Sequence, residues 1–161
     1  MREELLRLIE HNSRIELSEL AVLLGAEEAE VANEIADLEK NGVIAGYYTL
    51  INWEDTDQEM VDALIEVNVQ TQREVSFDKI AERLYLFDEV KACYLISASE
   101  YDFLLILEGK TMRQVANFVA SRLSSIEYVT GTATHFIMKR YKDNGTVFGE
   151  EKKDTREKVS C

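Results

Sequence analysis

The stretch from Ser97 to Asp102 combines a short polar turn with a carboxylate, and together these could hold an amino acid at both of its charged ends. Asp102 can receive an ammonium group, and backbone N–H groups of the turn can hold a carboxylate. The alternative is structural, because Asp102 can also order the turn through bonds to the backbone. The candidate ligand-binding residues here are Ser97, Ala98, Ser99, Glu100, Tyr101 and Asp102.

Three threonines alternate along a later β-favouring run, so their hydroxyl groups are expected to share one face of a strand. They are Thr130, Thr132 and Thr134. Thr132 and Thr134 would extend the ligand site as a wall lined by hydroxyl groups. The same spacing also follows from the ordinary preference of threonine for strands, so both interpretations stay open.

A second set of polar residues accompanies a helix-turn-helix pattern at about residues 17–36, in which Gly25 separates two helical runs. Side chains of these types reach the phosphates or base edges of DNA. Asn33 is the strongest base-contacting candidate, because asparagine can pair bidentately with adenine. The alternative is a solvated polar helix face. The candidate DNA-binding residues are Arg14, Ser18, Asn33 and Lys40.

The second helix of this pattern is strongly acidic, which opposes DNA binding. Residues 1–52 carry four Lys or Arg and eleven Asp or Glu, a net charge of −7. Contacts of Lys and Arg with phosphates supply much of DNA affinity, so the acids cost affinity. They could add selectivity, since a glutamate can accept from a cytosine amino group. If this helix enters a major groove, Glu34 is expected near phosphates or base edges.

Three helices are expected to position these DNA-binding candidates, over residues 2–12, about 18–24 and about 27–41. Ser18 is the expected N-cap of the second helix, and Gly25 lies just past its end. Asn41 and Gly42 should stop the third helix. Residues 43–52 favour β-structure and would form a wing, which makes this part a winged helix-turn-helix.

The remaining periodicities follow the order β-α-β-β-α-β, which is typical of a ferredoxin-like domain. In that fold two helices cover one face of a four-stranded antiparallel sheet. The other face would carry several apolar side chains here, which favours a partner. The expected segments are Val61–Val69, Phe77–Leu84, Val90–Ala98, Tyr101–Leu107, Met112–Leu123 and Tyr128–Met138.

The 161 residues therefore predict an α+β protein with two domains. We expect a DNA-binding domain over 1–52, a linker over 53–60, an effector-binding and oligomerisation domain over 61–140, and a tail over 141–161. Only residues 139–161 are net basic, with seven Lys or Arg against five Asp or Glu, within a total charge of −13. No apolar run approaches the ~20 residues that span a bilayer, and the charged N-terminus is unlike a signal peptide, which favours a cytoplasmic protein.

Enzyme and metalloprotein classes find little support in the sequence. It contains no Gly-rich phosphate loop, GxSxG elbow or HExxH spacing. The two cysteines, Cys93 and Cys161, form no disulfide framework, and with His11 and His135 they give no zinc-binding spacing. We therefore expect a protein that is not an enzyme, with no metal and no cofactor.

The order and spacing of these features resemble the Lrp/AsnC family of bacterial and archaeal transcription regulators over roughly residues 2–140. The most diagnostic segments are Ser18–Ala21, Leu38–Ile44 and Glu100–Phe103. The resemblance implies dimers formed through the C-terminal sheets, often higher oligomers, and an amino acid or related molecule bound at domain interfaces. The sequence departs from the family at Glu34, commonly Arg, and at Ser99, usually Gly.

Two hypotheses for function follow. The first is an Lrp/AsnC-type regulator that binds double-stranded operator DNA as a homodimer or higher homo-oligomer and responds to a small effector, which we expect to be an amino acid. The alternative is an effector-binding oligomerisation module that has weak or no DNA binding and acts with a DNA-binding paralogue. The acidic third helix separates the two.

Overall fold

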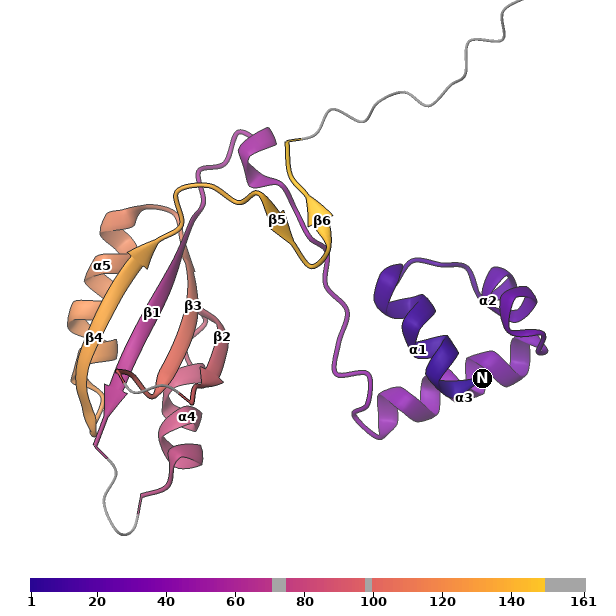
Figure 1. Ribbon diagram of the computed structural model, residues 1–161, viewed down its shortest axis with the longest axis horizontal. Coiled ribbons are helices and arrows are strands. Elements are labelled where there is room, and N and C mark those ends of the chain that lie inside the picture. The colour runs from indigo at the N-terminus through magenta and orange to yellow at the C-terminus, as the bar shows by residue number, and fades with distance from the viewer. Residues whose placement is uncertain (71–74, 98–99, 150–161) are drawn as a thin grey trace, which may run out of the picture. The chain divides into compact units, whose positions relative to one another are not determined.

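A computed structural model of the chain describes residues 1–70, 75–97 and 100–149 (Figure 1). The chain divides into two compact units, of which the first is Met1–Ile51 and the second begins at Asn52. Each unit has its own cluster of buried apolar side chains. The expected α+β composition, with helices alone in the first part and an antiparallel sheet in the second, is confirmed.

The first unit consists of three helices, α1 (Arg2–His11), α2 (Leu17–Leu24) and α3 (Glu28–Lys40). Gly25 has a φ of +61° and ends α2, and Gly42 has a φ of +70° just after α3. Glycine adopts these left-handed conformations without the penalty that a Cβ brings. The residues that bury the inner faces of the three helices are Leu5, Leu20, Ala21, Val31 and Leu38.

Two expectations for this unit are wrong in detail. Ser18 is not the N-cap of α2, because the helix begins earlier: Glu16 occupies the cap position and makes no side-chain cap bond. The wing strands expected over 43–52 do not form, since these residues contain no strand. A strand needs a hydrogen-bonding partner as well as β-favouring residues, and no such partner pairs with this segment within the described parts of the chain.

The second unit has the predicted order β-α-β-β-α-β. Its four-stranded sheet is antiparallel throughout, in the order β2-β3-β1-β4. The elements are β1 (Val61–Val69), α4 (Phe77–Tyr85), β2 (Val90–Leu95), β3 (Phe103–Gly109), α5 (Met112–Ser121) and β4 (Val129–Phe136), with short 3-10 helices η1 (Trp53–Asp55) and η2 (Leu123–Ser125).

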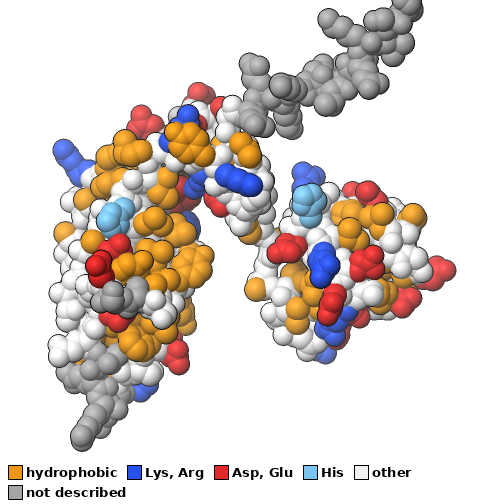
Figure 2. All heavy atoms as spheres, in the orientation of Figure 1, with side chains coloured by type: hydrophobic (Ala, Val, Ile, Leu, Met, Phe, Trp, Pro, Cys, Tyr) orange, Lys and Arg blue, Asp and Glu red, His pale blue; other side chains and the backbone are white. Residues whose placement is uncertain are grey.

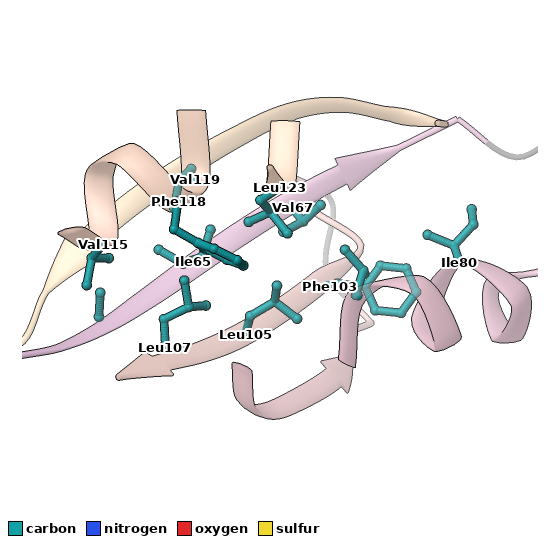
Figure 3. Close-up of a cluster of buried hydrophobic side chains, with 12 residues drawn as sticks. Ile65, Val67, Ile80, Phe103, Leu105, Leu107, Val115, Phe118, Val119 and Leu123 are labelled. Atoms are coloured by element: carbon teal, nitrogen blue, oxygen red, sulfur yellow. The ribbon is translucent and has the colours of Figure 1, made fainter. Parts of the chain in front are cut away.

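Both helices of this unit cover the same face of the sheet. Ser76 caps α4 by accepting the N–H of Lys79, and Thr111 caps α5 by accepting the N–H of Gln114. Alternate residues of β1 and β3 are fully buried beneath the helices, as the period-2 pattern of each strand requires (Figure 3). The largest fully buried side chains in this core are Ile65, Ile80, Leu84, Phe103, Leu105, Leu107 and Leu123.

A small hairpin follows the sheet, within the part expected to be a tail. It consists of β5 (Lys142–Asp143) and β6 (Thr146–Val147). Arg140 ties the base of the hairpin to the start of β1 by ion pairs with Asp62 and Asp143. Its guanidinium also lies 5.6 Å from the centre of the Phe148 ring. The hairpin is therefore fastened to the sheet by charge and by stacking.

Candidate functional site

The four predicted DNA-binding residues all lie on the surface of the three-helix unit. Asn33 and Lys40 are exposed on α3, Ser18 is exposed in the first turn of α2, and Arg14 is exposed in the turn before α2. The side chain of Asn12 accepts the backbone N–H of Arg14 at 3.1 Å, which orders that turn. The structure thus leaves all four side chains accessible to a large partner.

Glu34 does not lie where the DNA-contact expectation put it. Its Oε1 atom is 3.2 Å from Nε of Arg2 on α1, and the Glu34 side chain is only 22% exposed. Position 34 lies three residues after Val31 and four before Leu38, both fully buried, so its side chain shares their side of the helix. Glu34 therefore joins α3 to α1 and is not part of the outward face of α3.

A second contact on α3 was not predicted from the sequence. The hydroxyl of Tyr47 donates to Oε1 of Glu39 at 2.9 Å, which links the segment after α3 back to the helix. Burial raises the pKa of the Tyr47 hydroxyl, and the neighbouring Glu39 carboxylate raises it further. An eight-residue separation with no fixed period gives the sequence no signal for this pair.

In the second unit, Asp102 makes hydrogen bonds to the backbone of β1 and to the residue that follows β2. Its carboxylate Oδ2 accepts the N–H of Val69 at 2.8 Å, where β1 has a bulge. Its own N–H donates to the carbonyl of Val67 at 3.0 Å, and its carbonyl accepts the N–H of Ile96 at 2.8 Å. Asp102 therefore has a structural contact, and its side-chain bond reaches β1 rather than staying within its own turn.

The other predicted ligand residues differ in how exposed they are. Ser97 and Glu100 are exposed, and Tyr101 is partly buried. Ala98 and Ser99 lie outside the described residues. Thr132 and Thr134 stand opposite the buried residues Val67 and Ile65, so their side chains are on the face that the helices cover.

The hydroxyl group of Thr132 contacts another hydroxyl group of the same unit. Its hydroxyl oxygen is 3.4 Å from that of Ser124 in η2, so the two groups share a hydrogen bond. This contact stabilises the edge of the core, and it agrees with the structural interpretation of the threonine spacing. Neither Thr132 nor Thr134 lines the face of the sheet opposite the helices.

The face of the sheet opposite the helices, here called the open face, is largely apolar. Figure 2 shows hydrophobic side chains gathered over this face, with acidic and histidine side chains among them. Nε2 of His135 lies 3.3 Å from Oε1 of Glu66, so His135 and Glu66 form a pair at the surface. The strand register puts Leu64, Ala92, Tyr94, Leu104, Ile106 and Ala133 on this face.

The remaining reactive side chains of the described residues form no further cluster. Cys93 is half-buried against the core, and burial raises the pKa of its thiol. Within residues 1–70, 75–97 and 100–149, no group of three His, Cys, Asp or Glu side chains is arranged to hold a metal ion. Over the same ranges, no helix is both long and apolar enough to span a membrane.

Comparison with known proteins decides the family. Residues 62–147 match the model of the Lrp/AsnC ligand binding domain. An uncharacterized HTH-type transcriptional regulator of Bacillus subtilis, YugG, is 42% identical over 98% of this chain and 95% of its own length. The chain belongs to the Lrp/AsnC family. LrpA, an HTH-type transcriptional regulator of Pyrococcus abyssi, is also similar, with 27% identity over 86% of this chain and 94% of its own.

Solved structures share the fold of this Lrp/AsnC protein. The leucine response regulatory protein LrpA of Mycobacterium tuberculosis has a TM-score of 0.73 at 24% identity, covering 87% of this chain and 92% of its own. A transcriptional regulator of Neisseria meningitidis, in complex with L-Met, has a TM-score of 0.70 at 22% identity, covering 88% and 90%. The relatives are named as regulators of transcription, in agreement with the helix-turn-helix of this Lrp/AsnC chain.

Proposed function

We propose that this protein binds operator DNA through residues 1–52 as a homodimer or higher homo-oligomer, and that an amino acid changes that binding. Residues 61–140 would form the effector-binding and oligomerisation domain, and 53–60 the linker. The observation that carries the proposal is the near full-length match, at 42% identity, to an HTH-type regulator. A helix-turn-helix and an Lrp/AsnC ligand binding domain thus occur in one chain.

Accessible side chains of the first unit support the DNA-binding part. Helix-turn-helix proteins place the second helix of the motif in the major groove and cross the backbone with the first. Asn33 on α3 would contact a base edge, and Ser18 on α2 would reach a phosphate. Arg14 and Lys40 would supply phosphate contacts from either end of the motif. All four are exposed.

The turn before β3 supports the effector part. Asp102 holds this turn against β1 through its backbone and one carboxylate oxygen. A carboxylate has about four acceptor sites, so an ammonium group can bind the same side chain. The Neisseria regulator of the same fold is a complex with L-Met, which favours an amino acid as the effector class.

Binding of DNA and its response to an effector can be measured together. Titration of labelled genomic fragments at two salt concentrations should show binding that weakens with salt, because phosphate contacts release counterions. The same titration is repeated with each amino acid, and at least one should shift the midpoint. Absence of binding to any fragment at low salt would remove the DNA-binding part of the proposal.

The acidic surface of α3 favours a second candidate function, a module with weak or no DNA binding that acts with a DNA-binding paralogue. Residues 1–52 have a net charge of −7, with four basic and eleven acidic side chains, which repels phosphates. Under this alternative, the isolated protein binds no fragment, while a mixture with the paralogue does. The titration above separates the two.

Assembly through the open face gives a further prediction. Ile106→Glu places a charge among Leu64, Leu104 and Ala92 and should convert an oligomer to monomers, because an interface core excludes unpaired charge. Light scattering should give at least twice the 18.5 kDa of one chain for the wild type, and one chain mass for the variant.

The control for this prediction is Met112→Glu, which adds the same charge on the helix-covered side, where Met112 is 46% exposed at the start of α5. It should leave the wild-type mass unchanged. A wild-type protein that is monomeric at micromolar concentration would contradict assembly through this face.

A further inference from the structure

The rotation of α3 about its axis is determined by its buried residues. Val31 and Leu38 are fully buried, so the opposite side of the helix faces solvent. Each residue turns the helix by about 100°, which places Asn33 near the centre of the outward side and Glu30 on its flank, about 60° from Asn33. Asp37 lies one helical repeat after Glu30, on the same flank. All three are exposed in the structure.

Two other acids of α3 lie away from Asn33 around the helix axis, and each makes a contact of its own. Glu34 pairs with Arg2 at 3.2 Å, and Glu39 accepts from Tyr47 at 2.9 Å. Within the described parts of the chain, the side chain of Glu30 has no hydrogen-bond or ion-pair partner. Its carboxylate is therefore free to contact a molecule that approaches Asn33.

The chemistry of the major groove then restricts what a carboxylate at this position can contact. An ionised glutamate only accepts hydrogen bonds. Cytosine presents an amino donor with no acceptor, and adenine presents an amino donor beside the acceptor N7, which repels a carboxylate. Guanine presents two acceptors, and thymine presents one acceptor and a methyl group. Glu30 and Asn33 are three residues apart, about 4.5 Å along the helix axis, close to the spacing of about 3.4 Å between base pairs. With the helix axis along the groove, the two side chains would reach neighbouring base pairs.

We propose that Glu30 is a specificity-determining residue of the helix-turn-helix, which selects a cytosine beside the base pair contacted by Asn33. The inference rests on the proposed DNA-binding function and assigns a role to the negative charge of α3. Phosphates repel Glu30, so it lowers affinity for all DNA. It lowers affinity most at sites where no amino group of a base lies opposite its carboxylate. The acidic helix then supplies discrimination, while Arg14 and Lys40 supply attraction.

The test is selection of bound sequences from a randomised duplex library by the full chain, in three forms: wild type, Glu30→Gln and Glu28→Gln. Wild type should enrich sites with cytosine at one position of each half-site. Glu30→Gln should change that position to adenine, because glutamine pairs bidentately with the N6 and N7 atoms of adenine. On purified duplexes, the preference for cytosine over adenine should fall by at least about 10-fold in Glu30→Gln.

Glu28→Gln is the matched control. Glu28 and Glu30 are both acids of the first turn of α3, so each variant loses one charge near the same helix end. The two positions differ by about 200° around the axis, so Glu28 points away from Glu30. Both variants should bind DNA more tightly overall, but Glu28→Gln should keep the wild-type base preference.

The outcomes distinguish a failure of this inference from a failure of the proposed DNA-binding function. If all three proteins enrich sites with the same preferred base at every position, the role of Glu30 is overturned and the DNA-binding function stands. A change of preference in Glu28→Gln equal to that in Glu30→Gln also overturns it, because the effect would then be one of charge alone. Absence of enrichment by any of the three overturns the DNA-binding function and the inference together.

Discussion

Replacing Phe103 by alanine is expected to lower the free energy of unfolding by about 3–5 kcal/mol. Phe103 is 1% exposed at the start of β3, between Val67 of β1 and Leu95 of β2. Its ring meets that of Phe77 edge to face, with 5.9 Å between ring centres. Truncation removes this contact and leaves a cavity where α4 covers the sheet. Urea denaturation followed by circular dichroism measures the loss.

Tyr85→Ala is the control for this prediction, because it removes an aromatic ring that is 54% exposed at the end of α4. Its cost should be much smaller than that of Phe103→Ala at the same protein concentration, which must be held constant if the protein is an oligomer. Equal losses in the two variants would contradict the burial that the structure assigns to Phe103.

Asp102→Ala is expected to cost roughly 1–3 kcal/mol of unfolding free energy, because it leaves the N–H of Val69 without its acceptor at a partly buried bulge. Asp102→Asn retains a side-chain oxygen at nearly the same place, so it should recover most of this loss. Thermal or urea unfolding of the three proteins measures the difference.

The asparagine variant also separates the two roles considered for Asp102. It preserves the bond to β1 but loses the negative charge that an ammonium group would meet. If Asp102 contacts the effector, Asp102→Asn should be folded and should lose most of the shift that the amino acid produces in the DNA titration. If Asp102→Asn shows the full shift in the DNA titration, Asp102 only bonds to the backbone of β1 and does not contact the effector.

Much of the fold could be predicted from local patterns. The alternation from Val61 to Val69 can bury one face only in a strand, and the spacing from Phe77 to Leu84 can bury one face only in a helix. The order of these segments then indicates the ferredoxin-like arrangement, and Gly25 and Gly42 end α2 and α3 as expected. These features depend on interactions between residues that are near in sequence, so a single sequence contains them.

The sites were less predictable, because residues that are far apart in sequence decide them. Arg2 pairs with Glu34 on the inner side of α3, although the two are 32 positions apart. Asp102 accepts the N–H of Val69 across 33 positions, which gives a candidate ligand group a structural contact as well. The wing needed a partner strand that residues 43–52 do not find within the described chain.

The sequence by itself determined the long helices and the four-stranded sheet of this protein, their order and its resemblance to a family of regulators, since hydrophobic periodicity and turn residues act locally. Only the tertiary structure decided which polar side chains remain available to a ligand. A carboxylate satisfies its acceptor sites with whichever donor the packed chain brings to it, and the sequence pattern does not say which donor that will be. Glu30 and Glu34, four residues apart on one helix, differ in their surroundings: Glu34 is 22% exposed and forms an ion pair with Arg2, whereas Glu30 faces solvent.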